Sequence, residues 1–271
     1  MIRPVTEAKI PTVLSIAGSD SGGGAGIQAD LKAFAACGVH GTTAITAITA
    51  QNTLGVIAVE AIGPSMIVAQ VRAVVDDIGI DGVKIGMLGT VETIGAVDYC
   101  LDLVGDVPIV LDPVMVAESG ADLLAPDAKK SLVELILPRA SVTTPNIPEA
   151  RALTGLGEEA SQDEIAAAVV ALGPSAAVVT GGHSSGLVDV FSDGSRTILI
   201  EGPRHEATSA HGSGCTHSSA LASYMARGMD PEGAARAARE VASRAVADGL
   251  DSVGSGPGPV DVFGLARSAG G

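Results

Sequence analysis

The strongest constraint on the fold is a regular alternation of short apolar runs with helix-like patterns. Short runs rich in valine and isoleucine are typical of parallel strands that are covered on both faces. They occur at Val13–Ala17, Ala44–Ile48, Val56–Ile62, Gly82–Ile85, Ile109–Leu111, Ser141–Thr143 and Ala176–Val179. Helices are expected between them, at about Ile27–Ala36, Pro64–Asp77, Thr90–Leu103, Pro126–Leu137 and Asp163–Leu172. The alternation predicts an α/β fold, a three-layer α/β/α sandwich with a mostly parallel central sheet.

The pattern changes near residue 187. Leu187–Phe191 and Thr197–Ile200 flank the turn sequence Ser192–Ser195, which predicts an antiparallel hairpin at one edge of the sheet. Two alanine-rich helices follow, one that starts near Cys215 and one that is capped by Asp230. No internal repeat and no interdomain linker interrupts the chain, so a single domain over residues 1–271 is expected.

Composition excludes several classes of protein. The 271-residue chain has a net charge of −15, and no stripe of lysine and arginine is available to displace counterions from nucleic acid. Residues 33–59 carry no formal charge but are too polar for a membrane span, and the N-terminus lacks an apolar signal core. Cys37, Cys100 and Cys215 are far apart, which argues against a disulfide framework or a zinc site and favours a reducing cytoplasm.

A glycine cluster, Gly22-Gly23-Gly24-Ala25-Gly26, follows the first apolar run. Neither standard nucleotide loop fits it, because no glycine precedes a lysine anywhere and Ile27 stands where a dinucleotide fingerprint needs its third glycine. The cluster is therefore another kind of cradle, or a tight turn with nothing bound. Asp30, on the following helix, is expected to point back toward the loop. There it accepts a substrate hydroxyl or amine, or offsets the helix dipole.

A second cluster, His211-Gly212-Ser213-Gly214-Cys215, opens an alanine-rich helix. Its N–H groups at the positive end of the helix predict an anion hole, and the same dipole is expected to lower the pKa of Cys215. Cys215 is then a base or nucleophile; the alternative is a small apolar residue at a helix start. A dyad with His217 is disfavoured, because residues two apart on a helix point to different sides.

Two further motifs each have more than one interpretation. Gly182-His183-Ser184-Ser185-Gly186 matches the esterase nucleophile motif, but a strand follows it where a helix is required, so esterase chemistry is rejected. Asn146 and Glu149 have the spacing of a capping box, and they also lie where a parallel strand ends and a hydrated Mg²⁺ could bind. Both interpretations of Asn146 and Glu149 stay open.

Several segments together resemble one known family. They are AGSDSGGGAGIQADLKAF (17–34), ITAQNTLGV (48–56), KIGML (84–88), LDPVMVAESG (111–120), TPNIPEA (144–150), GGH (181–183) and HGSGCT (211–216). In this order and over nearly the whole chain, they resemble the hydroxymethylpyrimidine/phosphomethylpyrimidine kinases of thiamine biosynthesis, within the ribokinase-like superfamily. The resemblance implies a ribokinase-like fold and ATP-dependent phosphorylation of 4-amino-5-hydroxymethyl-2-methylpyrimidine to its monophosphate, and then to the diphosphate.

The resemblance also implies roles for individual residues. The pyrimidine would lie against Gly18, Asp30, Gln51, Met87 and Val114. ATP and Mg²⁺ are implied as well, with Asp112, Asn146 and Glu149 near the metal and phosphates, and Gly181, Gly182 and Ser209 toward the nucleotide. The N–H groups of Gly212, Ser213 and Gly214 would stabilise the transferring charge, with Cys215 as the base. A homodimer is implied too.

Three positions depart from the family pattern. Thr180 and Glu118 stand where the family usually or often has lysine, and His217 stands where an apolar residue is common. The two losses of positive charge leave the efficiency of the second phosphorylation open. Two alternatives therefore remain: a pyridoxal or pyridoxine kinase of the same superfamily, and a catalytically weak sensor that binds the pyrimidine.

Overall fold

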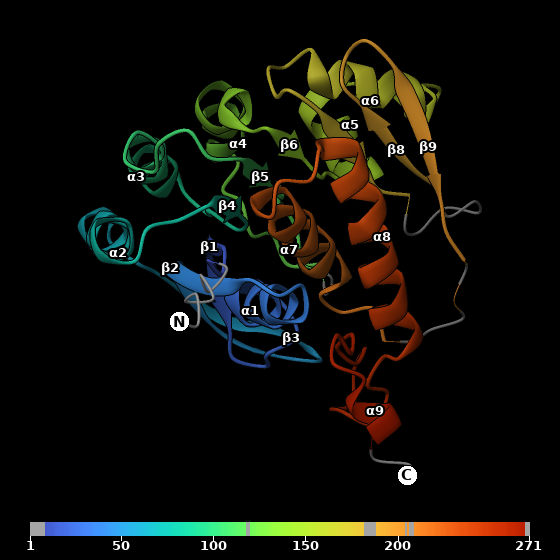
Figure 1. Cartoon of the computed structure of the whole chain (residues 1–271), viewed down its shortest axis with the longest axis horizontal. Coiled ribbons are helices and arrows are strands. Elements are labelled where there is room, and N and C mark those ends of the chain that lie inside the picture. Colours follow the sequence, from blue (N-terminus) through green and yellow to red (C-terminus); the bar gives the residue numbers. More distant parts are fainter. Residues whose placement is uncertain (1–8, 118–119, 182–187, 204, 206–208, 269–271) are drawn as a thin grey trace, which may run out of the picture.

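In the residues that a computed structural model describes, the chain forms a nine-stranded sheet covered by helices on both faces (Figure 1). The structure describes residues 9–117, 120–181, 188–203, 205 and 209–268. No helix in these described ranges is long and apolar enough to span a membrane. The strand order is β3-β2-β1-β4-β5-β6-β7-β8-β9.

The six central strands, β2, β1, β4, β5, β6 and β7 in sheet order, run parallel. Antiparallel strands complete both edges of the sheet, β3 at one edge and β8 with β9 at the other. The nine strands are β1 (Thr12–Asp20), β2 (His40–Asn52), β3 (Gly55–Ala61), β4 (Gly82–Ile85), β5 (Ile109–Leu111), β6 (Val142–Thr143), β7 (Ala177–Val179), β8 (Val188–Ser192) and β9 (Thr197–Glu201). The predicted fold class is confirmed, and so is the hairpin, which is β8 and β9.

The helices form the two outer layers. On one face of the sheet lie α1 (Gly26–Ala36), α7 (Ser213–Ala226) and α8 (Pro231–Ala247), and on the other lie α2 (Pro64–Asp77), α3 (Val91–Leu101), α4 (Ala128–Ser131), α5 (Ile147–Thr154) and α6 (Gln162–Val170) (Figure 1). A short helix, α9 (Leu265–Ser268), follows near the C-terminus. The expected cap of α8 is present, because the Asp230 side chain accepts from the Gly233 N–H.

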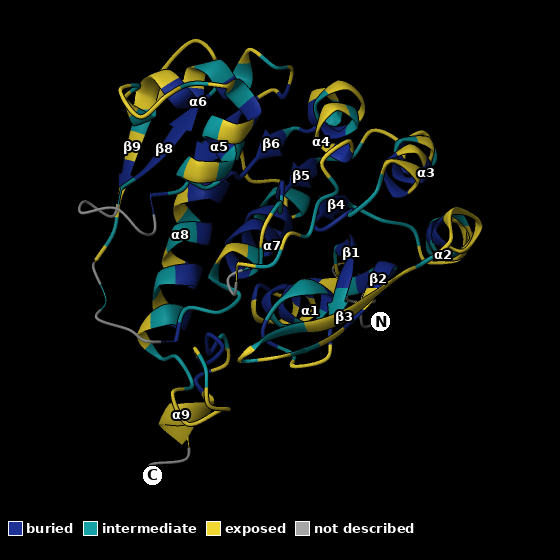
Figure 2. Ribbon diagram, turned by 180° about the vertical axis from the view of Figure 1, so that it is seen from behind, coloured by how far each residue is buried: buried dark blue, intermediate teal, exposed yellow. Residues whose placement is uncertain are grey.

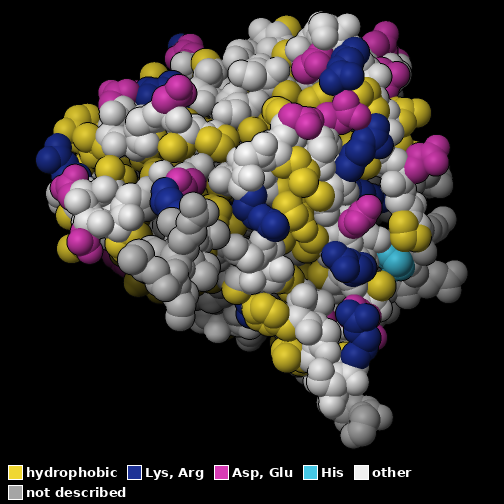
Figure 3. All heavy atoms as spheres, viewed as in Figure 1, with side chains coloured by type: hydrophobic (Ala, Val, Ile, Leu, Met, Phe, Trp, Pro, Cys, Tyr) yellow, Lys and Arg dark blue, Asp and Glu magenta, His cyan; other side chains and the backbone are white. Residues whose placement is uncertain are grey.

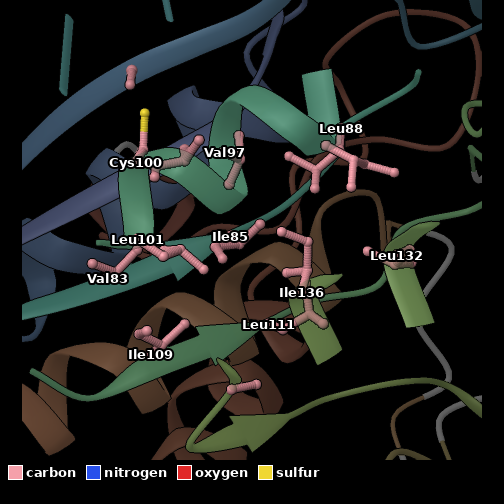
Figure 4. Close-up of a cluster of buried hydrophobic side chains, with 14 of the residues drawn as sticks. Val83, Ile85, Leu88, Val97, Cys100, Leu101, Ile109, Leu111, Leu132 and Ile136 are labelled. Atoms are coloured by element: carbon pink, nitrogen blue, oxygen red, sulfur yellow. The ribbon is translucent and has the colours of Figure 1, made fainter. Parts of the chain in front are cut away.

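Burial on both faces explains why the central strands are apolar throughout. Val13 packs with α1, α7 and α8, while its neighbour Leu14 packs on the opposite side with α2 and α3. This alternation is the two-residue repeat of an extended strand. Figure 4 shows Ile85 of β4 and Leu111 of β5 facing Val97 of α3, and Figure 2 shows the dark interior strands between partly exposed helices.

The run Val56–Ile62 departs from the prediction that it is a covered parallel strand. It forms β3, which pairs antiparallel with β2 through a short turn and lies at the edge of the sheet. No helix of the described residues covers the face that carries Ile57 and Val59, which are 76% and 51% exposed. An apolar run of this length is compatible with a covered or an uncovered strand, and only the order of strands distinguishes the two.

The predicted helix Pro126–Leu137 is also less regular than expected. It begins as α4 at Ala128, continues as a π-helix over Leu132–Ile136 and ends as a 3₁₀ turn over Leu137–Arg139. Pro138 has no N–H to donate to a preceding carbonyl, which is consistent with a change of hydrogen-bond spacing at this end.

The strand order indicates where a ligand would bind, at the carboxyl ends of the parallel strands. From β1 the chain adds β2 and β3 on one side of it and then crosses over to add β4 on the other side, so the direction of strand order reverses at β1. In open α/β sheets the crevice at the carboxyl ends of such strands is the usual ligand site. Functional side chains are therefore expected in this crevice.

Candidate active site

The predicted site residues gather at the carboxyl ends of the parallel strands. Gly18 lies near the end of β1, Met87 follows β4, Asp112 follows β5, Asn146 follows β6 and Gly181 follows β7. Helix α7 contacts β1, β4 and β5. Carboxyl ends of neighbouring parallel strands meet at one edge, so the sheet brings these segments together from distant parts of the chain.

The two glycine clusters pack directly against each other. A Cβ at Gly212 would overlap the carbonyl oxygen of Gly24, and a Cβ at Gly24 would overlap the ring of His211. Gly212 also has a left-handed backbone with φ of +84°, which favours glycine. Gly26 donates its N–H toward the thiol of Cys215. The bare backbone at Gly24 is therefore explained by the approach of the second loop rather than by a bound molecule.

Asp30 does not point back to the loop, and this part of the prediction is wrong. Its carboxylate is fully buried and accepts from Lys84 Nζ at 2.8 Å, Ser15 Oγ at 2.6 Å and Ser219 Oγ at 2.7 Å. Asp30 is the fifth residue of α1, beyond the first turn, and its side chain lies between α1, β1, β4 and α7. In this structure the Asp30 carboxylate is engaged by Lys84 and the two serines, and a contact with substrate stays a prediction.

Lys84 is the centre of this buried network. Its side chain is fully buried, and its Nζ also lies 4.0 Å from Asp112 Oδ2. Burial by itself would lower the pKa of Lys84, but the negative charge of Asp30, with Cys215 and Asp112 beyond it, raises the pKa well above its usual value. A permanent positive charge therefore lies beneath the start of α7.

Two carboxylates face the site beside this ammonium. Asp112 accepts from Ser218 Oγ at 2.9 Å, and burial raises its pKa although Lys84 and Ser218 work in the opposite direction. Burial and the charge of Asp112 raise the pKa of Glu149 to about 8. Two carboxyl groups with raised pKa values are held close enough to repel each other, and a cation between them would relieve that repulsion.

The capping box predicted at α5 is present. The Asn146 side chain accepts from the Glu149 N–H at 2.8 Å, and a Glu149 carboxylate oxygen accepts from the Asn146 N–H at 3.0 Å. The capping role and a place beside Asp112 are compatible, because one Glu149 carboxylate serves the cap while its charge still acts on Asp112. In the described ranges no group of three or more histidine, cysteine, aspartate or glutamate side chains could hold a metal by itself.

Cys215 lies at the start of α7, as predicted, but its pKa moves the other way. Burial raises the pKa of the thiol to about 12, against the pull of Lys84 and with a further rise from Asp112 and Asp30. The expectation of a lowered pKa considered the helix dipole and missed these two carboxylates. In the absence of ligands the thiol is therefore protonated at neutral pH.

The anion hole differs in one donor from the expected set. The Ser213 N–H donates to the Ala210 carbonyl at 3.0 Å, and the first helical bond runs from the Thr216 N–H to Gly212 at 2.9 Å. The N–H groups of Gly214 and Cys215 lie between these two and precede the regular bonding of the helix. Because the helix does not use them, these two N–H groups, with Gly212 beside them, are candidate donors to an anion.

The remaining predicted substrate residues line the same region. Gly18 is buried, and a Cβ there would lie 2.7 Å from the Met87 methyl carbon, so these two residues touch. Gln51 and Val114 are partly exposed. The Gln51 side chain accepts from Thr49 Oγ1 at 3.1 Å, which leaves its amide nitrogen for a ligand to engage.

The predicted nucleotide residues have different surroundings. Ser209 is 1% exposed and its hydroxyl donates to Asp251 of a C-terminal loop at 2.5 Å, so its contact with a nucleotide stays a prediction. The Gly181 N–H donates to Asp189 at 3.0 Å. Thr180 follows β7 and is bonded to Pro145. Gly182, Glu118 and the nucleophile-like motif 182–186 lie outside the described residues.

His217 makes no dyad with Cys215, in agreement with the prediction. It is 4% exposed, and its Nε2 lies 4.0 Å from Asp189 Oδ2, on the side toward α8 and β8. Burial lowers the pKa of His217, although Asp189 opposes this, so the ring is neutral at neutral pH.

The comparisons with known proteins agree with this geometry. The family model described as phosphomethylpyrimidine kinase matches residues 20–261. A hydroxymethylpyrimidine/phosphomethylpyrimidine kinase of Rhizobium meliloti is 48% identical over 257 residues, which is 92% of this chain and 96% of the relative. This chain belongs to the phosphomethylpyrimidine kinase family. The resemblance drawn from the sequence motifs is thereby confirmed.

Solved structures of phosphomethylpyrimidine kinases and of pyridoxal kinases both match the fold of this chain. A phosphomethylpyrimidine kinase from Clostridium difficile matches with a TM-score of 0.75 and 40% identity, over 86% of this chain and 97% of that one. A pyridoxal kinase from Staphylococcus aureus in complex with ADP matches with a TM-score of 0.87 and 31% identity, over 96% of each chain. The two kinds of kinase share this architecture, so the fold alone does not choose the substrate.

The sequence analysis of this phosphomethylpyrimidine kinase family member missed Lys84, Ser218 and Ser219. Lys84 had a visible signal, since a lysine inside the short apolar run Gly82–Ile85 is buried only if it is paired. The two serines gave no such signal in an alanine-rich helix. Asp20 and His211, which join the two glycine loops, were not predicted as site residues.

The Lys84–Asp30 pair predicts a large effect on stability. Lys84→Met removes the charge at similar length and leaves Asp30 buried without its partner, so we expect a loss of about 3–5 kcal/mol in the free energy of unfolding. Urea denaturation measures it. Adding Asp30→Asn to Lys84→Met should recover part of the loss, because no buried charge then remains unpaired. A loss below about 1 kcal/mol for Lys84→Met alone would contradict the assigned role.

Proposed function

We propose that this chain transfers the γ-phosphoryl group of ATP to the hydroxymethyl group of 4-amino-5-hydroxymethyl-2-methylpyrimidine, and then phosphorylates the monophosphate to the diphosphate. Family membership over residues 20–261 supports the kinase reaction. A relative named as a thiamine biosynthesis bifunctional protein supports the place of this reaction in thiamine biosynthesis. The second phosphorylation is the less supported of the two steps, because Thr180 and Glu118 remove positive charge that the family often has.

The proposal rests on one observation. The start of α7 with its Cys215 thiol, the buried Lys84 ammonium and the carboxylates of Asp112 and Glu149 lie together at the carboxyl ends of the parallel strands. The N–H groups of Gly214 and Cys215 are aimed out of α7, and Lys84 lies beneath them. Phosphoryl transfer needs positioning and charge stabilisation more than covalent chemistry from the protein. This arrangement supplies both.

We assign the pyrimidine to the pocket edge formed by Gly18, Met87, Gln51 and Val114. Met87 packs on the bare backbone of Gly18, with its methyl carbon 2.7 Å from where a Cβ would lie, and a thioether side chain makes favourable contacts with a flat ring. The Gln51 amide can pair with a ring nitrogen or the exocyclic amine. The hydroxymethyl group then lies toward Cys215, and the Asp30 contribution is indirect, through the position of Lys84.

The reaction uses these groups in a fixed order. The N–H donors of α7 hold the γ-phosphoryl oxygens, and the Lys84 ammonium stabilises the charge that builds up as the phosphoryl group moves. Cys215 takes the proton of the attacking hydroxyl. The pKa of Cys215 is about 12, because burial together with Asp112 and Asp30 disfavours the thiolate. The bound ligands therefore have to favour the thiolate.

We infer that Mg²⁺ is held by Asp112 and Glu149 with Asn146 nearby. The donor set fits, because Mg²⁺ in kinases is usually bound through one or two carboxylates together with substrate phosphates. Burial raises the pKa values of both carboxyl groups, and the charge of Asp112 raises that of Glu149 further, so a cation between them would stabilise both carboxylates. When bound, the cation would neutralise phosphate charge and offset the carboxylates that raise the pKa of Cys215.

We further propose that the chain works as a single domain and as a homodimer in the cytoplasm. The nine described strands lie in one sheet, and exposed apolar side chains of β2, β3 and the turn between them offer a surface for a second copy: Ile48, Leu54, Ile57 and Val59. Cys37, Cys100 and Cys215 are free thiols, which suits a reducing compartment. Basic and acidic side chains are interspersed on the face shown in Figure 3, an arrangement that does not suit a nucleic-acid partner.

The substrate is tested by measuring kcat/KM for ATP-dependent phosphorylation of the pyrimidine alcohol and of pyridoxal. We expect clear preference for the pyrimidine. The same assay with Cys215→Ala should lose about 10²–10³-fold in kcat, while nucleotide binding and the unfolding temperature stay close to those of the wild type. A preference for pyridoxal would favour the alternative kinase. Tight pyrimidine binding without turnover would favour the sensor, and full activity of Cys215→Ala would refute its role as base.

The metal site predicts a pH-dependent affinity for Mg²⁺. The pKa of Glu149 in the fold is about 8, above its ordinary 4.5, so protons compete with the cation below pH 8. Between pH 7 and pH 9 we expect the Mg²⁺ affinity to rise by about tenfold, measured from the rise in unfolding temperature with Mg²⁺ concentration. Glu149→Gln preserves the capping box and should remove this dependence. An unchanged pH dependence in that variant would assign the metal elsewhere.

A further inference from the structure

The two glycine loops are joined by a contact that the proposed reaction does not yet use. Asp20, the last residue of β1, is 3% exposed, and its Oδ2 lies 3.3 Å from Nε2 of His211. The two residues are 191 positions apart in the chain. His211 directly precedes Gly212, at which the anion hole begins.

Asp20 organises the first loop from within. Its carboxylate accepts from the N–H groups of Gly22 at 2.7 Å, Gly24 at 3.0 Å and Ala25 at 2.8 Å. Burial works against its charge, yet the hydrogen bonds from His211, Ala25 and Gly22 hold the pKa of Asp20 below its usual value. A buried carboxylate that accepts this many N–H groups is ionised and rigidly placed.

His211 organises the second loop from the other side. Its main chain bonds to the C-terminal segment, with the Val260 N–H donating to its carbonyl at 3.0 Å. Its ring lies against Gly24, where a Cβ would overlap it. The Asp20–His211 contact and the Gly24–Gly212 contact together leave the second loop little freedom to move against the first.

The two loops also meet beside Cys215, the proposed base. Gly26 belongs to the first loop and donates its N–H toward Cys215, which belongs to the second. The distance between the pyrimidine side and the phosphate side of the site is therefore set by how these loops are docked. A shift of about 1 Å in such a docking can cost about 10²-fold in rate, because the attacking oxygen and the phosphoryl group are no longer aligned.

We propose that Asp20 and His211 are positioning residues for phosphoryl transfer: the pair locks the first glycine loop to the anion hole at Gly212–Cys215. This role rests on the proposed kinase function. Neither residue contacts the reacting atoms in this scheme. Each acts through the loops that hold them.

The test is a kinetic double-mutant cycle with Asp20→Asn, His211→Ala and the double variant. We expect each single variant to lose about 10–100-fold in kcat, with KM for ATP changed by less than about threefold, because nucleotide binding persists while alignment is lost. The double variant should be little slower than the slower single variant, since both break one contact. Unfolding temperatures of all variants confirm that they are folded.

Two matched variants separate positioning from general structural damage. His211→Gln keeps a side-chain N–H donor that can reach Asp20 and should restore kcat to within about fivefold of the wild type. Asp193→Asn changes another aspartate that accepts several N–H groups of a turn, but in the β8–β9 hairpin. It should leave kcat unchanged.

The outcomes are distinguishable from those of the proposed function. If the wild type phosphorylates the pyrimidine alcohol, the kinase function stands and the cycle tests only the pair. Losses that multiply in the double variant, losses of less than about threefold, or losses confined to KM for ATP would overturn the positioning role. If the wild type does not turn over this substrate, the proposed function itself fails.

Discussion

The buried ion pair between Lys84 and Asp30 is the interaction on which the site depends. It joins β4 to α1, and through Ser219 and Ser15 it also involves α7 and β1. Because both charges are fully buried, neither can be left without the other at low cost. The pair therefore aligns α7 with the strands that end beneath it, and in the proposed reaction it keeps a positive charge close to the transferred phosphoryl group.

The glycines of the two loops serve this alignment. Gly24 and Gly212 allow two backbones to meet where any side chain would intervene, and Gly26 brings an N–H to Cys215. The result is a site with few flexible charged side chains, in a chain with a net charge of −15. Backbone N–H groups, one buried ammonium and a metal cation can hold anionic substrates without a surface rich in lysine and arginine.

Much of the architecture was predictable from the sequence. The apolar runs located the strands because burial on both faces leaves a clear pattern, and Asp230 and Asn146 marked helix starts because their side chains cap the helix locally. The covered or uncovered state of Val56–Ile62 was not predictable, since it depends on the order of strands. The same holds for the contact of Asp20 with His211, which no local pattern contains.

The electrostatics of the site were the hardest part to predict. The helix dipole at Cys215 can be inferred from the position of the residue in a helix, but burial of the thiol, together with Asp112 and Asp30 from other elements, raises its pKa instead. Asp30 was placed at the loop from its sequence neighbours, although its partners come from β1, β4 and α7. Such long-range charge pairs exist only once the sheet has been assembled.

The most direct test of the account is a crystal structure with the pyrimidine alcohol and a non-hydrolysable ATP analogue bound together. The account predicts that the γ-phosphate accepts from the N–H groups of Gly214 and Cys215, with the hydroxymethyl oxygen beside the Cys215 sulfur and Lys84 still paired with Asp30. A γ-phosphate bound instead over Gly22–Gly24, with the thiol remote from the hydroxymethyl group, would contradict it.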